Sequence, residues 1–215
     1  GAERAGPVAP DPRATPLALT CGEPAGIGPE IAAKAWMALG ARLPFLWIGD
    51  PAHLPPGLPV REVAVPAEAL TVAGQALPVL RHRFPDPATP GAPSPGNAAE
   101  VIAVIARAVR LAGEGAVSGV VTAPIHKQAL QEGAGFAHPG HTEYLAALAG
   151  VDHVAMMLAC DALRVVPLTI HVPLAEVPGL VTRGALVDTI RLVHHALRRD
   201  FGLDAPRIAV TGLNP

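Results

Sequence analysis

The chain has 215 residues, of which half are apolar and 16% are charged, and its formal net charge is −2 at pH 7. This composition excludes a disordered chain, because disordered segments combine low hydrophobicity with high net charge. The balance of 16 basic against 18 acidic residues argues against a nucleic-acid partner, which requires a clustered excess of Lys and Arg. No stretch reaches the ~18 uninterrupted apolar residues of a membrane-spanning helix, so we expect no membrane partner.

The first residues and the cysteines indicate the compartment. Residues 1–16 lack the apolar segment of a signal peptide, and we expect them to form a flexible tail. The two cysteines, Cys21 and Cys160, fit reduced thiols better than a disulfide framework. We therefore expect a cytoplasmic protein.

The first half of the chain alternates short apolar runs with helical patterns. Pro29 suits the first turn of a helix, where its missing N–H costs nothing. The segment 54–95 is rich in proline and is expected to be mostly loop. The predicted elements are strands at 17–20 and 45–48, a helix from Pro29 to before Gly40, a strand at 60–65 and a helix at 98–111.

The second half continues this alternation. Its predicted elements are strands at 117–121, 154–158 and 163–170, a helix from about Thr142, a helix at 182–200 and a strand at 207–211. Strands that alternate with helices imply crossover connections. We therefore predict an α/β fold with mostly parallel sheets sandwiched by helices, divided into the tail (1–16), a first subdomain (17–120) and a second subdomain (121–215).

The chain ends directly after the last predicted strand. Ligand-binding groups in parallel α/β sheets gather just beyond the carboxyl ends of strands. We therefore expect the C-terminal part of the fold and of the site to be missing, so that the second subdomain is truncated and the first is incomplete.

A glycine-rich loop from Gly22 to Gly28 follows the first predicted strand. Backbone N–H groups of such a loop can bind an anion at the start of the next helix. The loop matches neither GxGxxG nor GxxxxGK[ST], so the two familiar nucleotide-binding loops are excluded and a tight turn is the competing interpretation. Cys21, at the start of this loop, is more typical of a small buried residue than of a reactive thiol.

Three of the nine histidines lie near the ends of predicted strands: His126, His141 and His171. A neutral imidazole there can bind a divalent metal or a phosphate. One histidine is not a metal site, because a catalytic zinc-like ion needs about three protein ligands, and no HExxH, CxxC or carboxylate cluster completes one locally. Thr142 is placed to cap the following helix. The other six histidines have structural interpretations: His53, His82, His138, His153, His194 and His195.

Several segments in order resemble one enzyme family. They are Gly-Glu-Pro-Ala-Gly-Ile-Gly at 22–28, Thr-Ala-Pro-Ile-His-Lys at 122–127, Pro-Gly-His-Thr-Glu at 139–143, Met-Met-Leu at 156–158, Thr-Ile-His-Val-Pro-Leu at 169–174 and Gly-Leu-Asn-Pro at 212–215. Together, across 17–215, they resemble the 4-hydroxythreonine-4-phosphate dehydrogenase family of pyridoxal phosphate biosynthesis.

The resemblance implies an activity and a fold. The expected enzyme oxidises the C3 hydroxyl of 4-phosphonooxy-L-threonine with NAD, or NADP, and the product loses CO2 to give 3-amino-2-oxopropyl phosphate. The resemblance also implies a divalent metal (zinc, magnesium or cobalt), a homodimer with a shared active site, and a fold similar to isocitrate and isopropylmalate dehydrogenases.

The resemblance also implies residue roles. His141 and Thr142 match substrate-binding positions, and His171 matches a metal ligand. His126 is not assigned, because the family also accepts Asn there. The family's other metal histidines and its substrate-binding Lys, Asn and Arg would lie beyond Pro215, so we expect the 215-residue chain itself to be inactive. The catalytic base and the NAD contacts stay unassigned.

Other functions fit the same residues. A related dehydrogenase would act on four-carbon sugar-acid phosphates such as threonate 4-phosphate. A non-catalytic module would bind a phosphorylated ligand only. A phosphate acyltransferase of similar architecture would consume no NAD.

Overall fold

The computed structural model describes residues 15–213, and these form two compact units, 15–150 and 151–213. The predicted tail lies, up to residue 14, outside the described residues. The division after residue 150 differs from the predicted boundary after residue 120. The reason is that the two helices that follow residue 120 pack, through Leu130 and Tyr144, on a helix of the first unit.

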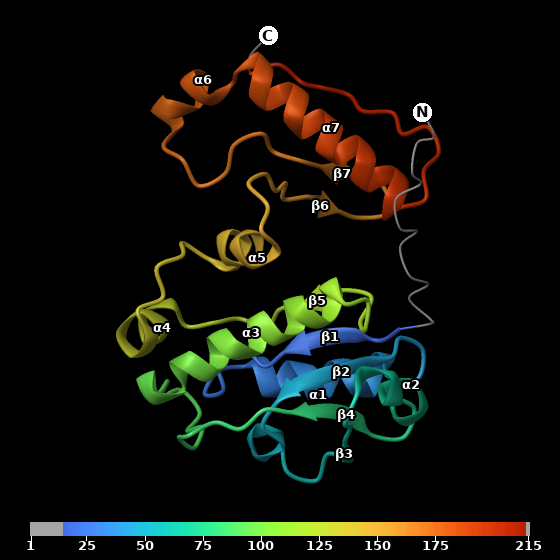
Figure 1. Cartoon of the computed structure of the whole chain (residues 1–215), viewed down its shortest axis with the longest axis vertical. Helices are drawn as coiled ribbons and strands as arrows, with labels where there is room; N and C mark the ends of the chain where they lie inside the picture. Colours follow the sequence, from blue (N-terminus) through green and yellow to red (C-terminus); the bar gives the residue numbers. More distant parts are fainter. Residues whose placement is uncertain (1–14, 214–215) are drawn as a thin grey trace. The chain divides into compact units, whose positions relative to one another are not determined.

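A five-stranded parallel sheet forms the centre of the first unit (Figure 1). Ala18 in the first strand pairs with Leu46 on one side and with Val120 on the other. The strands are β1 (Leu17–Thr20), β2 (Phe45–Gly49), β3 (Val60–Glu62), β4 (Leu77–Arg81) and β5 (Val120–Val121), in the spatial order β3-β4-β2-β1-β5.

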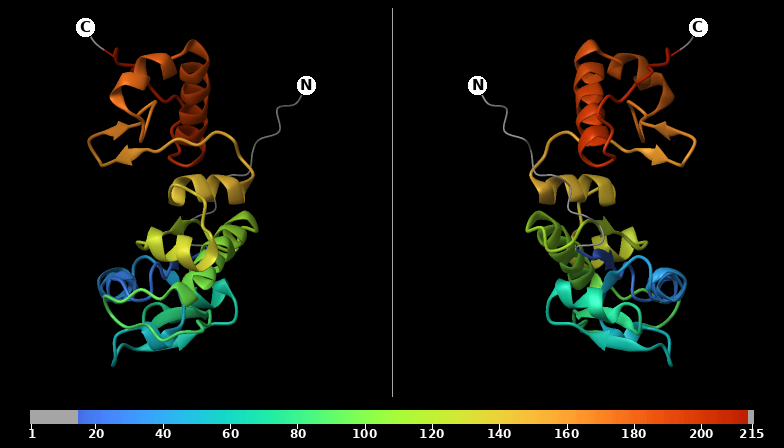
Figure 2. Two further views of the ribbon diagram at one scale, coloured as in Figure 1. Left: turned by 90° about the vertical axis from the view of Figure 1, so that its left-hand side faces the viewer. Right: turned by 90° about the vertical axis from the view of Figure 1, so that its right-hand side faces the viewer.

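Helices cover both faces of this sheet. The connection from β1 to β2 runs one way across the sheet and the connection from β4 to β5 runs the other way, so right-handed crossovers place their helices on opposite faces. Figure 2 shows these two helices, α1 and α3, on either side of the strands. The helices of the unit are α1 (Gly28–Leu39), α2 (Ala69–Val72), α3 (Ala98–Gly113), α4 (Lys127–Ala134) and α5 (His141–Ala149). The predicted α/β class is confirmed.

The core of the first unit is centred on β2. Leu46, Trp47 and Ile48 are fully buried, as expected for a parallel strand covered on both faces. From the α3 side, Val104 and Ala108 belong to the same cluster. The helix predicted at 98–111 is therefore present and packs on the sheet.

The prediction that 54–95 is mostly loop was wrong for β4. This strand lies between β3 and β2, where proline is normally excluded because it cannot donate to the ladder. Pro78 is tolerated because the β2–β4 ladder begins one residue later, at the Trp47–Val79 pair. The proline content of the segment therefore concealed an interior strand.

The second unit has less regular structure. Thr182 caps α7, since its Oγ1 accepts from the N–H of Ala185 at 3.2 Å. Val193 and Leu197, which lie four residues apart on α7, are buried. The elements are β6 (Leu158–Ala159) and β7 (Arg164–Val165), paired antiparallel, then α6 (Val177–Leu180) and α7 (Arg183–Arg199).

The strand predictions for this unit were largely wrong. The strands predicted at 154–158 and 163–170 are reduced to two residues each, and no strand forms at 207–211. A strand needs a neighbour for its backbone groups, and the described part of the unit offers only the short hairpin. Apolar side chains of these segments are accordingly exposed, with Leu158 at 58% and Val210 at 59%.

Among residues 15–213, no helix has both the length and the apolar character needed to cross a membrane.

Candidate functional site

The strand order reverses between β1 and β5. The chain leaves β1 toward β2 and arrives at β5 from β4, so these neighbours form the topological switch point of the sheet. Ligands of open α/β sheets bind beyond the carboxyl ends of strands at such a point. The loops that follow β1 and β5, residues 21–28 and 122–126, therefore flank the candidate site.

Two hydrogen bonds hold these loops together at the ends of β1 and β5. The N–H of Glu23 donates to the carbonyl of Pro124 at 2.8 Å, and the N–H of Ala123 donates to Oγ1 of Thr20 at 3.2 Å. Gly22 has φ +66°, and a Cβ added there would clash with the carbonyl oxygen of Pro124. The glycine-rich loop is thus a tight turn packed against the loop after β5.

Two side chains at this turn are buried. Glu23 is 5% exposed, and its Oε1 accepts from the N–H of Ala25 at 3.0 Å. Cys21 is fully buried, and this burial strongly raises the pKa of its thiol. A protonated thiol is a poor nucleophile. Cys21 is therefore a small buried core residue and not a reactive thiol, as predicted.

His126 begins α4 and acts as its cap. Its Nδ1 accepts from the N–H of Ala129 at 3.2 Å, which satisfies one of the unpaired donors at the helix start. The imidazole thus has a structural use as a helix cap.

His141 and Thr142 are the first two residues of α5. The N-cap is Gly140, without a side-chain hydrogen bond, so the prediction that Thr142 caps this helix was wrong. His141 is partly buried, and this burial lowers the pKa of its imidazole. Its Nε2 is buried and has no hydrogen-bond partner among the described residues. The structure therefore places a partly buried histidine with an unpartnered ring nitrogen at the start of α5.

An aromatic cluster fixes the position of α5. Tyr144 packs edge-to-face on Phe136, with ring centroids 5.2 Å apart, and His138 packs against both rings. The hydroxyl of Tyr144 donates to the carbonyl of Ile102 in α3 at 3.5 Å. The start of α5 is thereby anchored to α3, which lies against the sheet.

Lys127 is a candidate site residue that the sequence analysis did not assign. It is the first residue of α4, and a Cβ added to Gly140 would lie 3.9 Å from its Nζ and 3.4 Å from Oε2 of Glu143. The starts of α4 and α5 therefore meet at Gly140. In the sequence, the only indication of a role for Lys127 was its position at the end of the Thr-Ala-Pro-Ile-His-Lys segment.

His171 lies in the second unit, in irregular chain between β7 and a short 3-10 helix (Leu174–Glu176). The strand predicted at 163–170 is reduced to β7, so His171 does not directly follow a strand. Its side chain is exposed, and with φ +55° it is the one non-glycine residue with positive φ within 15–213. Such backbone conformations cluster at functional sites.

The part of the chain that the structure describes contains no group of three His, Cys, Asp or Glu side chains that could hold a metal ion. His171 therefore supplies at most one ligand. The residues present do not by themselves fit a complete metal centre.

Two of the other histidines, His82 and His53, make contacts that stabilise the fold. Nε2 of His82 lies 2.7 Å from Oε2 of Glu100. His53 packs on Phe84, and His195 is exposed on α7.

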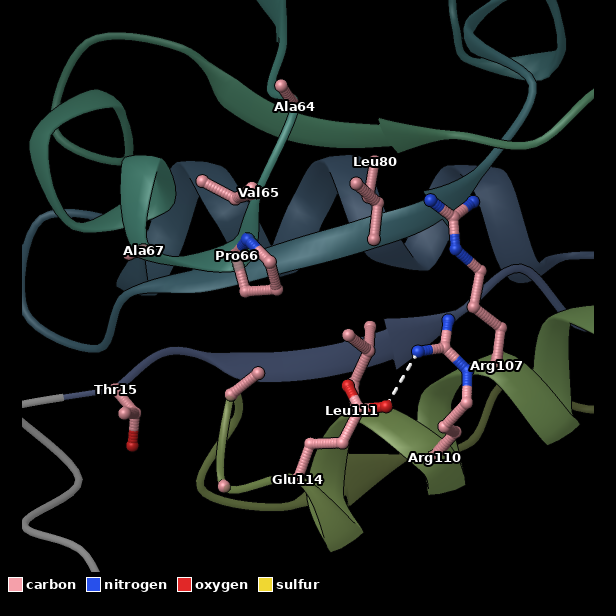
Figure 3. A pocket seen from close by; sticks show the side chains of 12 residues that line it. Thr15, Ala64, Val65, Pro66, Ala67, Leu80, Arg107, Arg110, Leu111 and Glu114 are labelled. Atoms are coloured by element: carbon pink, nitrogen blue, oxygen red, sulfur yellow. Dashed lines mark hydrogen bonds and ion pairs between the residues drawn. The ribbon is translucent and has the colours of Figure 1, made fainter.

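A cavity lies elsewhere in the first unit (Figure 3). It has a volume of about 560 Å³ and lies between α3 and the segment 64–67, with Arg107 and Arg110 on its wall. Arg110 is paired with Glu114 at 2.8 Å. None of the predicted site residues lines this cavity.

The family model described as "Pyridoxal phosphate biosynthetic protein PdxA" matches residues 44–215. The chain belongs to the PdxA family. The resemblance found in its motifs is thus confirmed over most of its length.

Two relatives of this chain share one name. A 4-hydroxythreonine-4-phosphate dehydrogenase from Ruegeria sp. (strain TM1040) is 58% identical over 199 residues, which are 93% of this chain and 61% of the relative. One from Paracoccus denitrificans (strain Pd 1222) is 56% identical over 94% of this chain and 62% of its own. The PdxA chain therefore spans less than two thirds of the length of these relatives.

Solved structures agree with the fold. A 4-hydroxythreonine-4-phosphate dehydrogenase from Klebsiella pneumoniae superimposes with a TM-score of 0.83 at 32% identity, over 94% of this chain and 64% of that one. A terephthalate 1,2-cis-dihydrodiol dehydrogenase from Burkholderia xenovorans LB400 gives a TM-score of 0.66 at 25% identity, over 94% of this chain and 62% of that one.

Proposed function

We propose that this chain provides the first part of an NAD-dependent 4-hydroxythreonine-4-phosphate dehydrogenase. The observation that carries the proposal is the 58% identity, over 93% of the chain, to a relative with that name. In the proposed reaction, hydride leaves C3 of 4-phosphonooxy-L-threonine for NAD and the C3 hydroxyl loses a proton. The resulting β-keto acid then loses CO2 to give 3-amino-2-oxopropyl phosphate.

His141 and Thr142 bind the substrate in this proposal. The support is their place at the start of α5, where N–H groups without intrahelical partners and the helix dipole favour an anion. The Nε2 of His141 is buried without a hydrogen-bond partner among the described residues, and in this proposal it turns toward the substrate on binding. The packing of Tyr144 and Phe136 with residues of α3 holds the start of α5 against the first unit.

His171 is proposed as one ligand of a divalent ion, zinc, magnesium or cobalt. An exposed imidazole on a backbone with positive φ is consistent with this role, because the surrounding chain must hold it there against its conformational preference. The remaining ligands would come from residues that are not part of this sequence. A divalent ion would supply Lewis-acid stabilisation of the substrate oxygen.

The cofactor and assembly complete the proposal. NAD, or NADP, accepts the hydride, and the enzyme is a cytoplasmic homodimer with a shared active site. Free thiols at Cys21 and Cys160 are consistent with a reducing compartment.

An alternative substrate class is compatible with this scaffold. The terephthalate dihydrodiol dehydrogenase has a similar fold, so this scaffold occurs in dehydrogenases named for other substrates. A dehydrogenase of four-carbon sugar-acid phosphates therefore remains the second candidate.

The test uses a chimera, in which this sequence replaces the matching segment of the Ruegeria relative. We expect formation of NADH that requires 4-phosphonooxy-L-threonine, NAD and a divalent ion together. A higher kcat/KM for threonate 4-phosphate would support the alternative substrate. No NADH with either substrate, from a folded chimera and with the active Ruegeria enzyme as control, would refute the dehydrogenase proposal.

The metal role has its own readout. His171→Ala in the chimera should lower the bound metal measured by elemental analysis after dialysis, whereas His195→Ala, on the exposed side of α7, should not. Equal metal content in the two variants would remove His171 from the proposed ligands.

A further inference from the structure

The segment 86–97, which we call the strap, lies between β4 and α3 in the chain (Figure 1). Near its middle, the N–H of Gly91 donates to the carbonyl of Ala25 at 2.8 Å. Near its end, the carbonyl of Pro95 approaches Gly133 of α4 so closely that a Cβ on this glycine would clash with it. The strap therefore contacts both the glycine-rich turn after β1 and the helix that follows β5.

One buried side chain closes the base of the strap. Asn97 is 1% exposed and is the N-cap residue of α3. Its Oδ1 accepts from the N–H of Asp86 at 3.0 Å, and its Nδ2 donates to the carbonyl of Asp86 at 3.1 Å. The carboxylate of Asp86 in turn accepts from Oγ of Ser94 at 2.5 Å. The two ends of the strap are thus held together, and one of them is fixed to α3.

The tip of the strap, residues 87–93, is stiff. Three of its residues are proline, which fixes φ near about −65°. The N–H of Ala92 donates to the carbonyl of Thr89 at 2.9 Å and closes a turn, in which Gly91 has the positive φ, +77°, that Pro-Gly turns adopt. Within residues 15–213, no hydrogen bond other than that of Gly91 links the tip to a segment outside the strap. A stiff loop loses little entropy when it forms a contact, so this one bond is sufficient to fix the tip.

The contact at Ala25 continues into both loops of the candidate site. The N–H of Ala25 donates to Oε1 of Glu23 at 3.0 Å, and the N–H of Glu23 donates to the carbonyl of Pro124 at 2.8 Å. A path of hydrogen bonds therefore runs from the strap, through the turn after β1, to the loop after β5. Because these two loops flank the switch point of the sheet, release of the strap would loosen the wall of the site.

We propose that the strap is a positioning element of the dehydrogenase site, in which Asn97 closes the base and Gly91 holds the glycine-rich turn in its binding-competent arrangement. This inference rests on the proposed function for the reaction that the site performs. Both residues act through the turn and not by contact with the substrate. When the strap is released, only a fraction of the molecules keeps the turn in place, and the apparent affinity for a ligand of the site decreases by that fraction. The kcat of the saturated enzyme stays the same, because a bound ligand selects the competent arrangement.

Gly57 provides a matched control for Gly91. The two glycines have φ +80° and +77°, and neither has an atom within 4 Å of an added Cβ. Alanine at either position therefore has the same local cost of positive φ. Gly57 lies between β2 and β3, outside the strap. Urea denaturation should show similar, small losses of stability for Gly91→Ala and Gly57→Ala, but only Gly91→Ala should disturb the hydrogen bond to Ala25.

Hydrogen exchange in the 215-residue chain, measured by NMR, tests the coupling without turnover. We expect the amides of Ala25 and Gly26 to exchange about threefold faster or more in Gly91→Ala, and at the original rate in Gly57→Ala. Asn97→Leu removes both hydrogen bonds to Asp86 and should accelerate the same two amides. Where Asn97→Leu fails to fold, the comparison of the two glycine variants decides alone. Equal exchange of Ala25 and Gly26 in Gly91→Ala and Gly57→Ala would overturn the inference.

The kinetic consequence is measured in the chimera with the Ruegeria relative. Gly91→Ala should raise KM for 4-phosphonooxy-L-threonine or for NAD about threefold or more, at an unchanged kcat. A merely structural role would lower the amount of folded enzyme, and so lower the apparent kcat at an unchanged KM, equally in Gly91→Ala and Gly57→Ala; this result would refute the positioning role. An inactive unsubstituted chimera would refute the dehydrogenase proposal, whereas the hydrogen-exchange comparison would still decide whether the strap holds the turn.

Discussion

The N–H of Glu23 donates a 2.8 Å hydrogen bond to the carbonyl of Pro124 and joins the loop after β1 to the loop after β5. This contact holds the two loops together at the topological switch point of the sheet. It requires a glycine at the preceding position, since Gly22 has φ +66° and no room for a Cβ beside Pro124. The glycine-rich loop is thus explained by packing between two loops.

Gly22→Ala should destabilise the first unit by about 2 kcal/mol or more, because it adds a steric clash to the cost of positive φ. Gly57→Ala is the matched control, since Gly57 has φ +80° but no atom within 4 Å of an added Cβ. Urea denaturation should show a clearly smaller loss for Gly57→Ala. Equal losses would mean that the close approach to Pro124 is unimportant.

Thr20→Val should cost about 1–3 kcal/mol, because it leaves the buried N–H of Ala123 without its acceptor. Thr71→Val removes a hydroxyl that donates to the carbonyl of Glu68 on the exposed surface, and should cost less than about 0.5 kcal/mol. The free energies of unfolding of the two variants are compared. A Thr20→Val chain as stable as Thr71→Val would contradict the role of this hydrogen bond.

The sequence predicted the first unit better than the second. The apolar patterns of β1, α1, β2 and α3 arise because these elements are buried against one another within the described chain. These elements were therefore predicted correctly from the sequence. β4 was missed because a proline such as Pro78 normally indicates the end of a strand. It is accepted here only because the β2–β4 ladder starts at the next residue. The segment 207–211 has the apolar pattern of a strand, but it has no adjacent strand within the described residues.

The candidate site was predicted only in part. His141 and Thr142 could be named from their motif, but Lys127 could not, because its proximity to Gly140 depends on how the starts of α4 and α5 meet. The predicted cap at Thr142 failed because the N-cap of α5 is Gly140, two residues earlier. The positive φ of His171 could not be predicted from the sequence, because a histidine does not by itself indicate this backbone conformation.

Stability should depend on pH through His141. Burial lowers the pKa of His141 in the folded chain, whereas the unfolded chain binds this proton with the ordinary pKa of about 6.5. The unfolded state therefore holds more protons below pH 6.5, and stability falls as the pH decreases from there toward the folded pKa. His141→Gln should flatten this slope in denaturation measured at several pH values. An unchanged slope, or an NMR titration of His141 above pH 6.5, would contradict the prediction.

The two thiols should react at very different rates. Cys160 is exposed and Cys21 is buried with a raised pKa. Iodoacetamide should therefore label Cys160 in the native chain, and Cys21 only after denaturation. Comparable labelling of both thiols in the folded chain, detected by mass spectrometry, would contradict the packing described for Cys21.

The central claim is that the substrate binds at the start of α5. The most direct measurement is kcat/KM for 4-phosphonooxy-L-threonine in the chimera carrying His141→Ala, with His195→Ala as the control. We predict a decrease of about tenfold or more for His141→Ala, from the loss of a hydrogen bond to a charged group, and no significant change for His195→Ala. Equal kcat/KM values in the two variants would contradict the account.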